Sequence, residues 1–117
     1  MPGYNPGLHI ISSFSAGVAQ LNDARGCKQI FDELIGELTL QKVGEVYHSF
    51  EGGGFTAVVC LTESHVSIHT WPEFNLATFD VFLSDFRNNN SEKVREFFSR
   101  SIEYFNATVI SKQEISR

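Results

Sequence analysis

A polar run between residues 62 and 73, Thr-Glu-Ser-His-Val-Ser-Ile-His-Thr-Trp-Pro-Glu, holds the densest group of chemically competent side chains in this sequence. His65 and His69 are spaced i, i+4, and Glu73 follows four residues later. On a helix, this spacing would place three metal ligands on one face. Polar and apolar residues alternate here, however, and alternation predicts a strand. Four strand residues span about 13 Å, so the two imidazoles cannot share a metal ion, and we exclude a metal site.

A second possible chemistry is a serine nucleophile at Ser64, with a histidine base and a carboxylate from Glu73 or Asp80. The sequence has no G-x-S-x-G nucleophile elbow, and 117 residues are few for the fold that carries it. We therefore disfavour a serine hydrolase. The plain structural alternative is a solvated edge strand with surface histidines, and the pattern alone leaves it open.

The elements around this segment follow from apolar patterns and turn residues. We expect strands over residues 8–14, 42–50, 55–62, 65–71, 76–83 and 107–114. A glycine triplet between the second and third of these strands predicts a hairpin turn. Such a triplet could also cradle phosphate, but neither a helix start nor Gly-Lys-Ser/Thr follows it, so the turn is favoured.

Two stretches have the period of an amphipathic helix. Apolar side chains recur at i, i+3, i+4 and i+7 within residues 24–39, and a second set marks residues 91–106. We expect residues 15–22 to form a loop. The candidate N-cap residues are Asn22 or Asp23 for the first helix and Ser91 for the second.

The resulting order, β-α-β-β-β-β-α-β, has too few helices to cover both faces of a sheet. It predicts an α/β fold, a two-layer sandwich with a mainly antiparallel sheet and two principal helices on one face. A length of 117 residues corresponds to a single domain over 1–117.

Composition limits the classes of binding partner and the cellular compartment that we expect for this protein. A net charge of −5 argues against a nucleic-acid partner, and the absence of a long apolar run argues against a membrane partner. Cys27 and Cys60 form no CxxC pair, and residues 1–14 lack the features of a signal peptide, so we expect reduced thiols and a cytoplasmic location. The 11 phenylalanines predict a large aromatic core, or an aromatic pocket or interface.

The stretch from Glu63 to Glu73, Glu-Ser-His-x-Ser-x-His-Thr-Trp-Pro-Glu, resembles the signature of the prokaryotic S-adenosylmethionine decarboxylase proenzymes. The resemblance is sharp over about residues 47–84, and it extends over most of the chain in length and element order. Members of that family are zymogens that cleave themselves to become pyruvoyl-dependent carboxy-lyases of polyamine and spermidine biosynthesis.

The resemblance implies cleavage between Glu63 and Ser64. The Ser64 hydroxyl would attack the Glu63 carbonyl, a base would remove the Ser64 α-proton, and β-elimination would free Glu63 as a new C-terminus. The products would be a β chain of residues 1–63 and an α chain of residues 64–117 that begins with a pyruvoyl group, the covalent cofactor. Its ketone would hold the substrate amine as a Schiff base and accept the electrons left by CO₂.

The same resemblance assigns roles to five more side chains. His69 matches the processing histidine of the family, and Thr56 occupies the position of a hydroxyl residue that supports the intermediate. Glu73 corresponds to the glutamate that binds the ribose hydroxyls, and Phe50 to the ring that lies against adenine. We place His65 with the substrate-binding residues. Without the resemblance, Thr56 and Phe50 would be ordinary strand and core residues.

The sequence departs from the family pattern around the expected substrate. Residues 74–76, Phe-Asn-Leu, stand where the family has Tyr-Gly-Tyr, and Ser84 stands where the family has a cysteine that protonates the product. An alcohol is a weaker acid than a thiol, so Ser84 could relay a proton and Cys60 could substitute for the missing cysteine. His9 matches a family histidine that has no role we can assign.

We therefore predict a pyruvoyl-dependent S-adenosylmethionine decarboxylase that forms a homodimer of β/α protomers through a sheet edge. The departures leave two alternatives open. One is a pyruvoyl-dependent ornithine or arginine decarboxylase with an acidic pocket at Glu73, Asp80 or Asp85, and the other is a non-catalytic relative.

Overall fold

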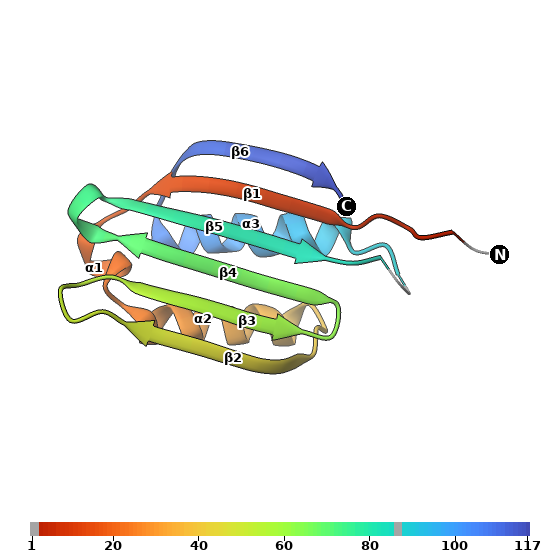
Figure 1. The fold of residues 1–117 in the computed structure, drawn as a ribbon, viewed down its shortest axis with the longest axis horizontal. Coiled ribbons are helices and arrows are strands. Elements are labelled where there is room, and N and C mark those ends of the chain that lie inside the picture. Colours follow the sequence, from red (N-terminus) through yellow and green to blue (C-terminus); the bar gives the residue numbers. More distant parts are fainter. Residues whose placement is uncertain (1–2, 86–87) are drawn as a thin grey trace.

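A six-stranded sheet and the turns at its strand ends carry the residues that the sequence marks for chemistry (Figure 1). The structure is a computed structural model that describes residues 3–85 and 88–117. The strands are β1 (Leu8–Ser15), β2 (Lys42–Ser49), β3 (Phe55–Leu61), β4 (Ser64–Trp71), β5 (Leu76–Leu83) and β6 (Thr108–Ser116). They lie in the order β2-β3-β4-β5-β1-β6, and each pair of neighbours is antiparallel. The predicted mainly antiparallel sheet is confirmed.

Two long helices pack on one face of this sheet and complete the predicted two-layer α/β sandwich (Figure 1). The helical elements are α1 (Val18–Leu21), α2 (Ala24–Glu37), α3 (Ser91–Phe105) and the 3₁₀ turn η1 (Pro72–Phe74). Helix α2 contacts β2 and β3, whereas α3 contacts β1 and β5. Within residues 3–85 and 88–117, no helix is both long enough and apolar enough to cross a membrane.

The helix starts correct two expectations and confirm one. Asp23 caps α2 as predicted, because its side chain accepts a hydrogen bond from a first-turn N–H. The loop expected over residues 15–22 contains α1, a single turn too short to give a periodic signal, and it buries Leu21. The N-cap prediction for α3 is wrong by one residue: Asn90 holds the cap position and Ser91 is the first helical residue.

The core between sheet and helices is built largely from phenylalanine. The fully buried rings include Phe14, Phe31, Phe55, Phe79, Phe97 and Phe105. Phe79 of β5 stacks on Phe31 of α2 and on Phe98 of α3, with ring centroids 5.8 and 5.9 Å apart. Burial of each ring contributes roughly 1.5–3 kcal/mol, so these contacts join both helices to the middle of the sheet.

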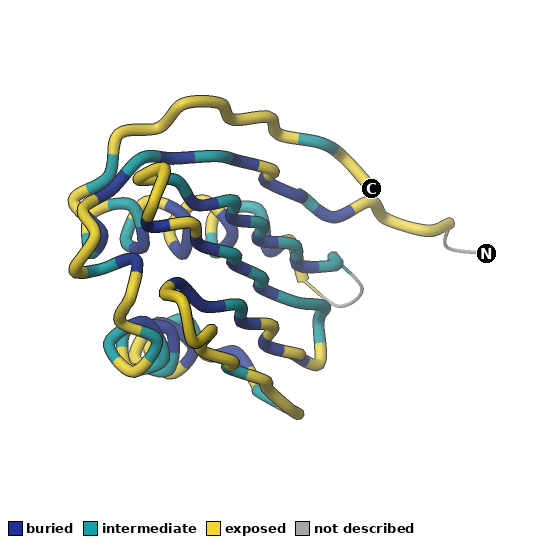
Figure 2. The backbone as a smooth tube through the Cα atoms, turned by 60° about the vertical axis from the view of Figure 1, so that its left-hand side comes forward, coloured by how far each residue is buried: buried dark blue, intermediate teal, exposed yellow. Residues whose placement is uncertain are grey.

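The sheet face away from α2 and α3 carries the polar residues, and we call it the open face. Burial alternates along the central strands, while the edge strands β2 and β6 are exposed over most of their length (Figure 2). Strand register places the following side chains on the open face: His9, Ile11 and Ser13 of β1, Thr56, Val58 and Cys60 of β3, His65, Ser67 and His69 of β4, and Thr78, Asp80 and Phe82 of β5.

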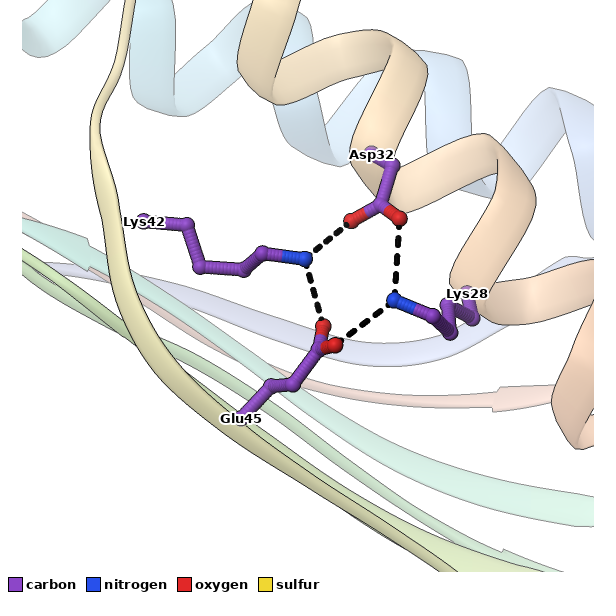
Figure 3. Close-up of polar contacts among 4 residues, drawn as sticks. All are labelled: Lys28, Asp32, Lys42 and Glu45. Carbon is purple, nitrogen blue, oxygen red and sulfur yellow. Dashed lines mark hydrogen bonds and ion pairs between the residues drawn. The ribbon is translucent and has the colours of Figure 1, made fainter.

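Four charged side chains join edge strand β2 to helix α2 in a closed ring of ion pairs (Figure 3). Lys28 Nζ lies 3.0 Å from Asp32 and 2.6 Å from Glu45, and Lys42 Nζ lies 2.9 and 2.7 Å from the same two carboxylates. Hydrogen bonds from Lys28 and then Lys42 lower the pKa of Glu45. The ring fixes β2, which leads into Phe50 and the glycine turn beside the candidate site.

Candidate active site

The predicted site residues lie at the two ends of β4 rather than in one place. One group, at the C-terminal end of the strand, consists of Phe50, Thr56, His69 and Glu73. The other, at the N-terminal end, consists of Glu63, Ser64, His65 and Ser84. From Ser64 to His69 the strand advances five residues, or about 16 Å. Within one chain the two groups therefore do not meet.

The first group surrounds a cavity of about 330 Å³, which we call the aromatic pocket. Its lining residues are Phe50, Gly53, Thr56, His69, Thr70, Trp71 and Glu73. Phe50 is 50% exposed and Trp71 is 39% exposed, which is unusual for rings of this size. The alternative that Phe50 is an ordinary core residue is therefore wrong, whereas its contact with an adenine ring stays a prediction. Trp71 is a lining residue that the sequence reasoning did not assign.

Thr56 and His69 are brought together by the register of β3 and β4. Their Cα atoms are direct partners, and the Thr56 hydroxyl forms a hydrogen bond with His69 Nδ1. When Nδ1 donates to Thr56, Nε2 keeps a free lone pair, as a base requires. The structure thus brings together two residues to which the resemblance gives roles in self-cleavage, although the sequence did not predict their contact.

The glycine turn closes one side of the aromatic pocket. Gly54 has φ +85°, and a Cβ there would lie 2.8 Å from the carbonyl oxygen of Thr70. Its N–H donates to Asn22 Oδ1 at 2.7 Å, which ties the turn to the start of α2. Glycine is therefore needed for the close approach of the hairpin to β4, and the triplet acts as the predicted turn.

The second group surrounds the Glu63–Ser64 peptide bond, and we call it the scissile end: Glu63, Ser64, His65, Ser84 and Asn90. Ser64 has φ +149°, a conformation that L-residues rarely adopt. The main-chain N–H of Ser84 donates to the Glu63 carbonyl oxygen at 2.7 Å. Ser64 Oγ lies 3.4 Å from His65 Nδ1, a long contact. The structure thus combines a strained backbone with a donor on the preceding carbonyl.

Asn90 completes the scissile end, and the sequence reasoning missed it. Its side chain is buried and donates to both a Glu63 carboxylate oxygen and the Ser84 carbonyl oxygen, the latter at 2.8 Å. The sequence gives only a weak signal, an Asn-Asn-Asn run before a helix, which indicates a loop. The run contains no motif that would distinguish its third member.

A histidine cluster on the open face adjoins the scissile end. His9 is 5% exposed, and its ring centroid lies 6.0 Å from that of His65. Arg117 Nη1 donates to His9 Nδ1 at 3.1 Å, and His9 Nε2 lies 3.7 Å from an Asp80 oxygen. Burial lowers the pKa of His9, although Asp80 partly opposes this shift. The neutral ring is therefore the favoured form.

Other candidate residues lie near the scissile end without a direct contact to the bond. Cys60 is exposed, is not in a disulfide, and pairs in register with His65 on the open face. A shallow hollow of about 950 Å³ reaches Glu63 and Ser84 from the turn that precedes β2. In residues 3–85 and 88–117, no group of three His, Cys, Asp or Glu side chains could hold a metal ion.

Comparison with known proteins places this geometry in context. Residues 8–117 match the sequence profile described as S-adenosylmethionine decarboxylase. The S-adenosylmethionine decarboxylase proenzyme of Archaeoglobus fulgidus is 40% identical over 78 residues, which is 67% of this chain and 66% of that protein. The proenzyme of Aquifex aeolicus is 36% identical over 77 residues, or 65% of this chain and 57% of that protein. These alignments span less than two thirds of each relative's length.

Two further likenesses extend over nearly the whole chain. The proenzyme of Thermoplasma acidophilum is 29% identical over 112 residues, which is 95% of this chain and 82% of that protein. The crystal structure of the adenosylmethionine decarboxylase from Aquifex aeolicus superposes with a TM-score of 0.86 at 29% identity, and it covers 98% of this chain and 92% of that one.

Proposed function

This chain belongs to the S-adenosylmethionine decarboxylase family, and from that premise we propose that it cleaves its own Glu63–Ser64 bond and decarboxylates S-adenosylmethionine. The geometry of the Glu63–Ser64 bond carries the first half of the proposal. The carbonyl to be attacked already accepts the Ser84 N–H at 2.7 Å, and the residue that would attack it has φ +149°. The donor favours charge on that oxygen, and the strained φ is relieved when the bond breaks.

The cleavage steps use only groups of this chain and one water molecule. Ser64 Oγ bonds to the Glu63 carbonyl carbon, its proton passes to a base, and the C–N bond breaks to give an ester and a free amine. Removal of the Ser64 α-proton then expels the Glu63 carboxylate. Water replaces the nitrogen of the resulting enamine, ammonia leaves, and residue 64 becomes a pyruvoyl group. The Ser84 N–H stabilises the oxyanion of the first step.

The residues at the scissile end fit a pyruvoyl group formed at position 64. Its ketone would supply an electrophile for the substrate amine and an electron sink during loss of CO₂. The Ser84 N–H and the His65 ring border that position. The N–H can donate a hydrogen bond and the imidazole can transfer a proton near the reacting carbon, and the Ser84 hydroxyl and the Cys60 thiol are the candidates for proton return.

The aromatic pocket supports a nucleoside substrate. Phe50 and Trp71 offer rings for an adenine or a sulfonium, and Glu73 can accept hydrogen bonds from two ribose hydroxyls. Ornithine and arginine could use the carboxylate of Glu73, but they have no purine ring to cover the exposed faces of both Phe50 and Trp71. The exposed rings therefore favour S-adenosylmethionine over the two amino acids.

A complete site requires both groups, and we propose that a second copy of the chain supplies the missing one. A base must lie within hydrogen-bond reach of the hydroxyl that it deprotonates, about 3 Å. In one chain His69 lies about 16 Å along β4 from Ser64. Two copies with their β4 strands antiparallel would bring the scissile end of each against the aromatic pocket of the other.

The open face, rather than a sheet edge, is the surface that permits this. Pairing through β2 would leave the two β4 strands five strand spacings apart, about 24 Å, and pairing through β6 about 34 Å. Sheets that pack face to face lie only about 10 Å apart. Ile11 and Val58, 38% and 36% exposed, would be covered in such a dimer. We therefore replace edge pairing with face pairing in the proposal.

Intact-mass analysis of the folded protein after maturation tests the first half of the proposal. We expect two chains, 1–63 and 64–117, the second with a carbonyl that reacts with a hydrazide. Release of labelled CO₂ from S-adenosylmethionine, ornithine and arginine, assayed side by side, tests the second half. A chain that stays whole would identify a non-catalytic relative. Turnover of an amino acid instead of S-adenosylmethionine would contradict the substrate assignment.

A further inference from the structure

The side-chain amide of Asn90 bridges two segments of the scissile end that meet at the bond to be broken. Its Nδ2 donates to a Glu63 carboxylate oxygen, on the acyl side of that bond, and to the Ser84 carbonyl oxygen at 2.8 Å. Ser84 in turn donates its N–H to the Glu63 carbonyl oxygen at 2.7 Å. Three hydrogen bonds thus connect residues 63, 84 and 90 in a closed loop.

Asn90 has little freedom to make any other contact. Its exposed fraction is 1%, and its main-chain N–H donates to Asp85 Oδ1 at 2.9 Å. Both side-chain partners are acceptors, so the NH₂ group must face them. The Oδ1 atom is then left buried without a hydrogen-bond partner in the described structure. An unpaired buried oxygen costs stability, and a smaller cap residue such as serine would avoid that cost.

The bridge acts on the geometry of the scissile carbonyl. Without Asn90, the Glu63 carboxylate would lose its hydrogen bond to the segment after β5, and the Glu63 carbonyl would keep the one from the Ser84 N–H. Holding the Ser84 carbonyl fixes the plane of the peptide that follows residue 84, and holding the Glu63 carboxylate limits rotation of residue 63. Both restraints keep the donor aligned with the carbonyl oxygen while φ of Ser64 stays at +149°.

We propose that Asn90 is a positioning residue for self-cleavage, which clamps the Glu63 carboxylate and the Ser84 carbonyl so that the Ser84 N–H stays on the scissile carbonyl. The inference rests on the proposed cleavage at Glu63–Ser64. It adds a residue that touches neither the attacking hydroxyl nor the substrate. Its effect belongs to maturation and not to turnover by the matured enzyme.

The first test is Asn90→Asp, which keeps the size of the side chain and removes the donor. The introduced carboxylate would face those of Glu63 and Asp85, the titratable groups that contact this position from the β3–β4 turn and from the segment after β5. We expect cleavage at pH 8 to slow at least about tenfold relative to wild type. As the pH falls toward 5, the ratio of the two rates should recover, because neighbouring carboxylates share a proton and the protonated acid donates again.

The matched control is Gln29→Glu, which likewise turns a side-chain amide into a carboxylate, at an exposed position on α2 that lines neither the aromatic pocket nor the hollow at the scissile end. It should cleave like wild type at each pH. Cleavage of Asn90→Asp at the control rate, or a slowing that does not change with pH, would overturn the positioning role while the cleavage proposal stands. If wild type and Gln29→Glu also stay whole, the proposed cleavage itself fails, and the role of Asn90 fails with it.

A second variant covers the case in which Asn90→Asp folds poorly. Glu63→Gln combined with Asn90→Asp reverses the bridge, because the amide introduced at position 63 can donate at pH 8 to the carboxylate introduced at position 90. We expect the double variant to cleave at least about threefold faster than Asn90→Asp alone, a coupling that two unrelated positions would not give. Unfolding midpoints of each variant in a Ser64→Ala background report stability separately from cleavage. A double variant no faster than Asn90→Asp, with equal midpoints, would overturn the proposal.

Discussion

The two groups of candidate residues, at opposite ends of β4, are positioned by different kinds of structure. At the aromatic pocket, regular strands set the positions: Thr56 and His69 are register partners, and Trp71 follows on the same face. At the scissile end, the positions depend on the positive φ of Ser64 and on Asn90, the cap residue of α3. The groups proposed to bind the substrate thus lie on or beside regular strands, whereas the bond proposed to break lies in the turn between β3 and β4. In the proposed function, one end provides the bond that is cleaved and the other provides the base and the substrate pocket.

The largest effect is expected when the proposed nucleophile is removed. Ser64→Ala should abolish cleavage, because no other hydroxyl occupies the position from which the Glu63 carbonyl is attacked. Ser99→Ala, at an exposed position on α3 and away from the open face, is the control and should mature normally. Intact mass reports both. Two chains from Ser64→Ala would place the chemistry elsewhere.

Glu73 tests whether the aromatic pocket acts in binding rather than in cleavage. Glu73→Gln keeps the size of the side chain but loses the charge that strengthens hydrogen bonds to a ribose. We expect KM for S-adenosylmethionine to rise about tenfold to hundredfold, with cleavage unchanged. Steady-state kinetics of matured enzyme give the value, and Glu92→Gln, exposed on α3, controls for loss of one charge. An unaltered KM would remove Glu73 from the substrate site.

A substitution at Ser84 distinguishes the role of its main-chain N–H in cleavage from that of its side chain in turnover. Ser84→Cys leaves the N–H on the Glu63 carbonyl, so cleavage should stay within about twofold of wild type. A thiol is a far stronger acid than an alcohol, so turnover, or the fraction of misprotonated product, should change by a few fold. Single-turnover assays and the mass of the α chain measure the two effects. Identical turnover would exclude the Ser84 side chain from proton return.

The smallest effect is expected far from both ends, in the ion-pair ring of α2 and β2. Glu45→Gln removes a carboxylate whose pKa is lowered by Lys28 and then Lys42. A lowered folded-state pKa stabilises the fold above the unfolded pKa of about 4.5, and that contribution is lost as pH falls through the folded value. Because the pairs are largely exposed, Tm at pH 7 should drop by at most about 2 °C.

Thermal melts between pH 3 and 7 check this prediction, with Glu51→Gln in the exposed hairpin turn as the control. The difference between Glu45→Gln and wild type should shrink toward zero below about pH 4. A Tm loss that persists at pH 3 would mean that Glu45 acts through packing rather than charge.

What the sequence predicts follows the same division between the two ends. Alternation along residues 65–71 and 76–83 is enough to predict the strands and their polar face, whereas the strand partners of His69 come from the structure. The motif also locates Ser64. It does not reveal that five strand residues hold Ser64 and His69 apart, because a linear signature carries no distances. Residues that act together in a family can lie in different copies of the chain.

The sequence reasoning missed Asn90 and α1 because neither has a recognisable local sequence pattern. The sequence around an asparagine that precedes a helix does not show whether its side chain is buried or solvated. Only the hydrogen bonds of Asn90 to Glu63 and Ser84 show that it is buried. The four residues of α1 are too few for a 3.6-residue period to appear. Ser64 likewise gives no sign of its φ, since that angle is imposed by the turn after β3 and by the hydrogen bond from Ser84.

The division of one site between two copies is tested most directly by complementation. Tagged His69→Ala is coexpressed with Ser64→Ala, mixed dimers are isolated through the tag, and cleavage of each chain is followed by intact mass. We predict that His69→Ala stays whole alone but is cleaved in the mixed dimer, where the Ser64→Ala copy supplies His69. Failure to cleave in the mixed dimer would contradict the account. Cleavage of His69→Ala by itself would also contradict it and would make His65 of the same chain the base.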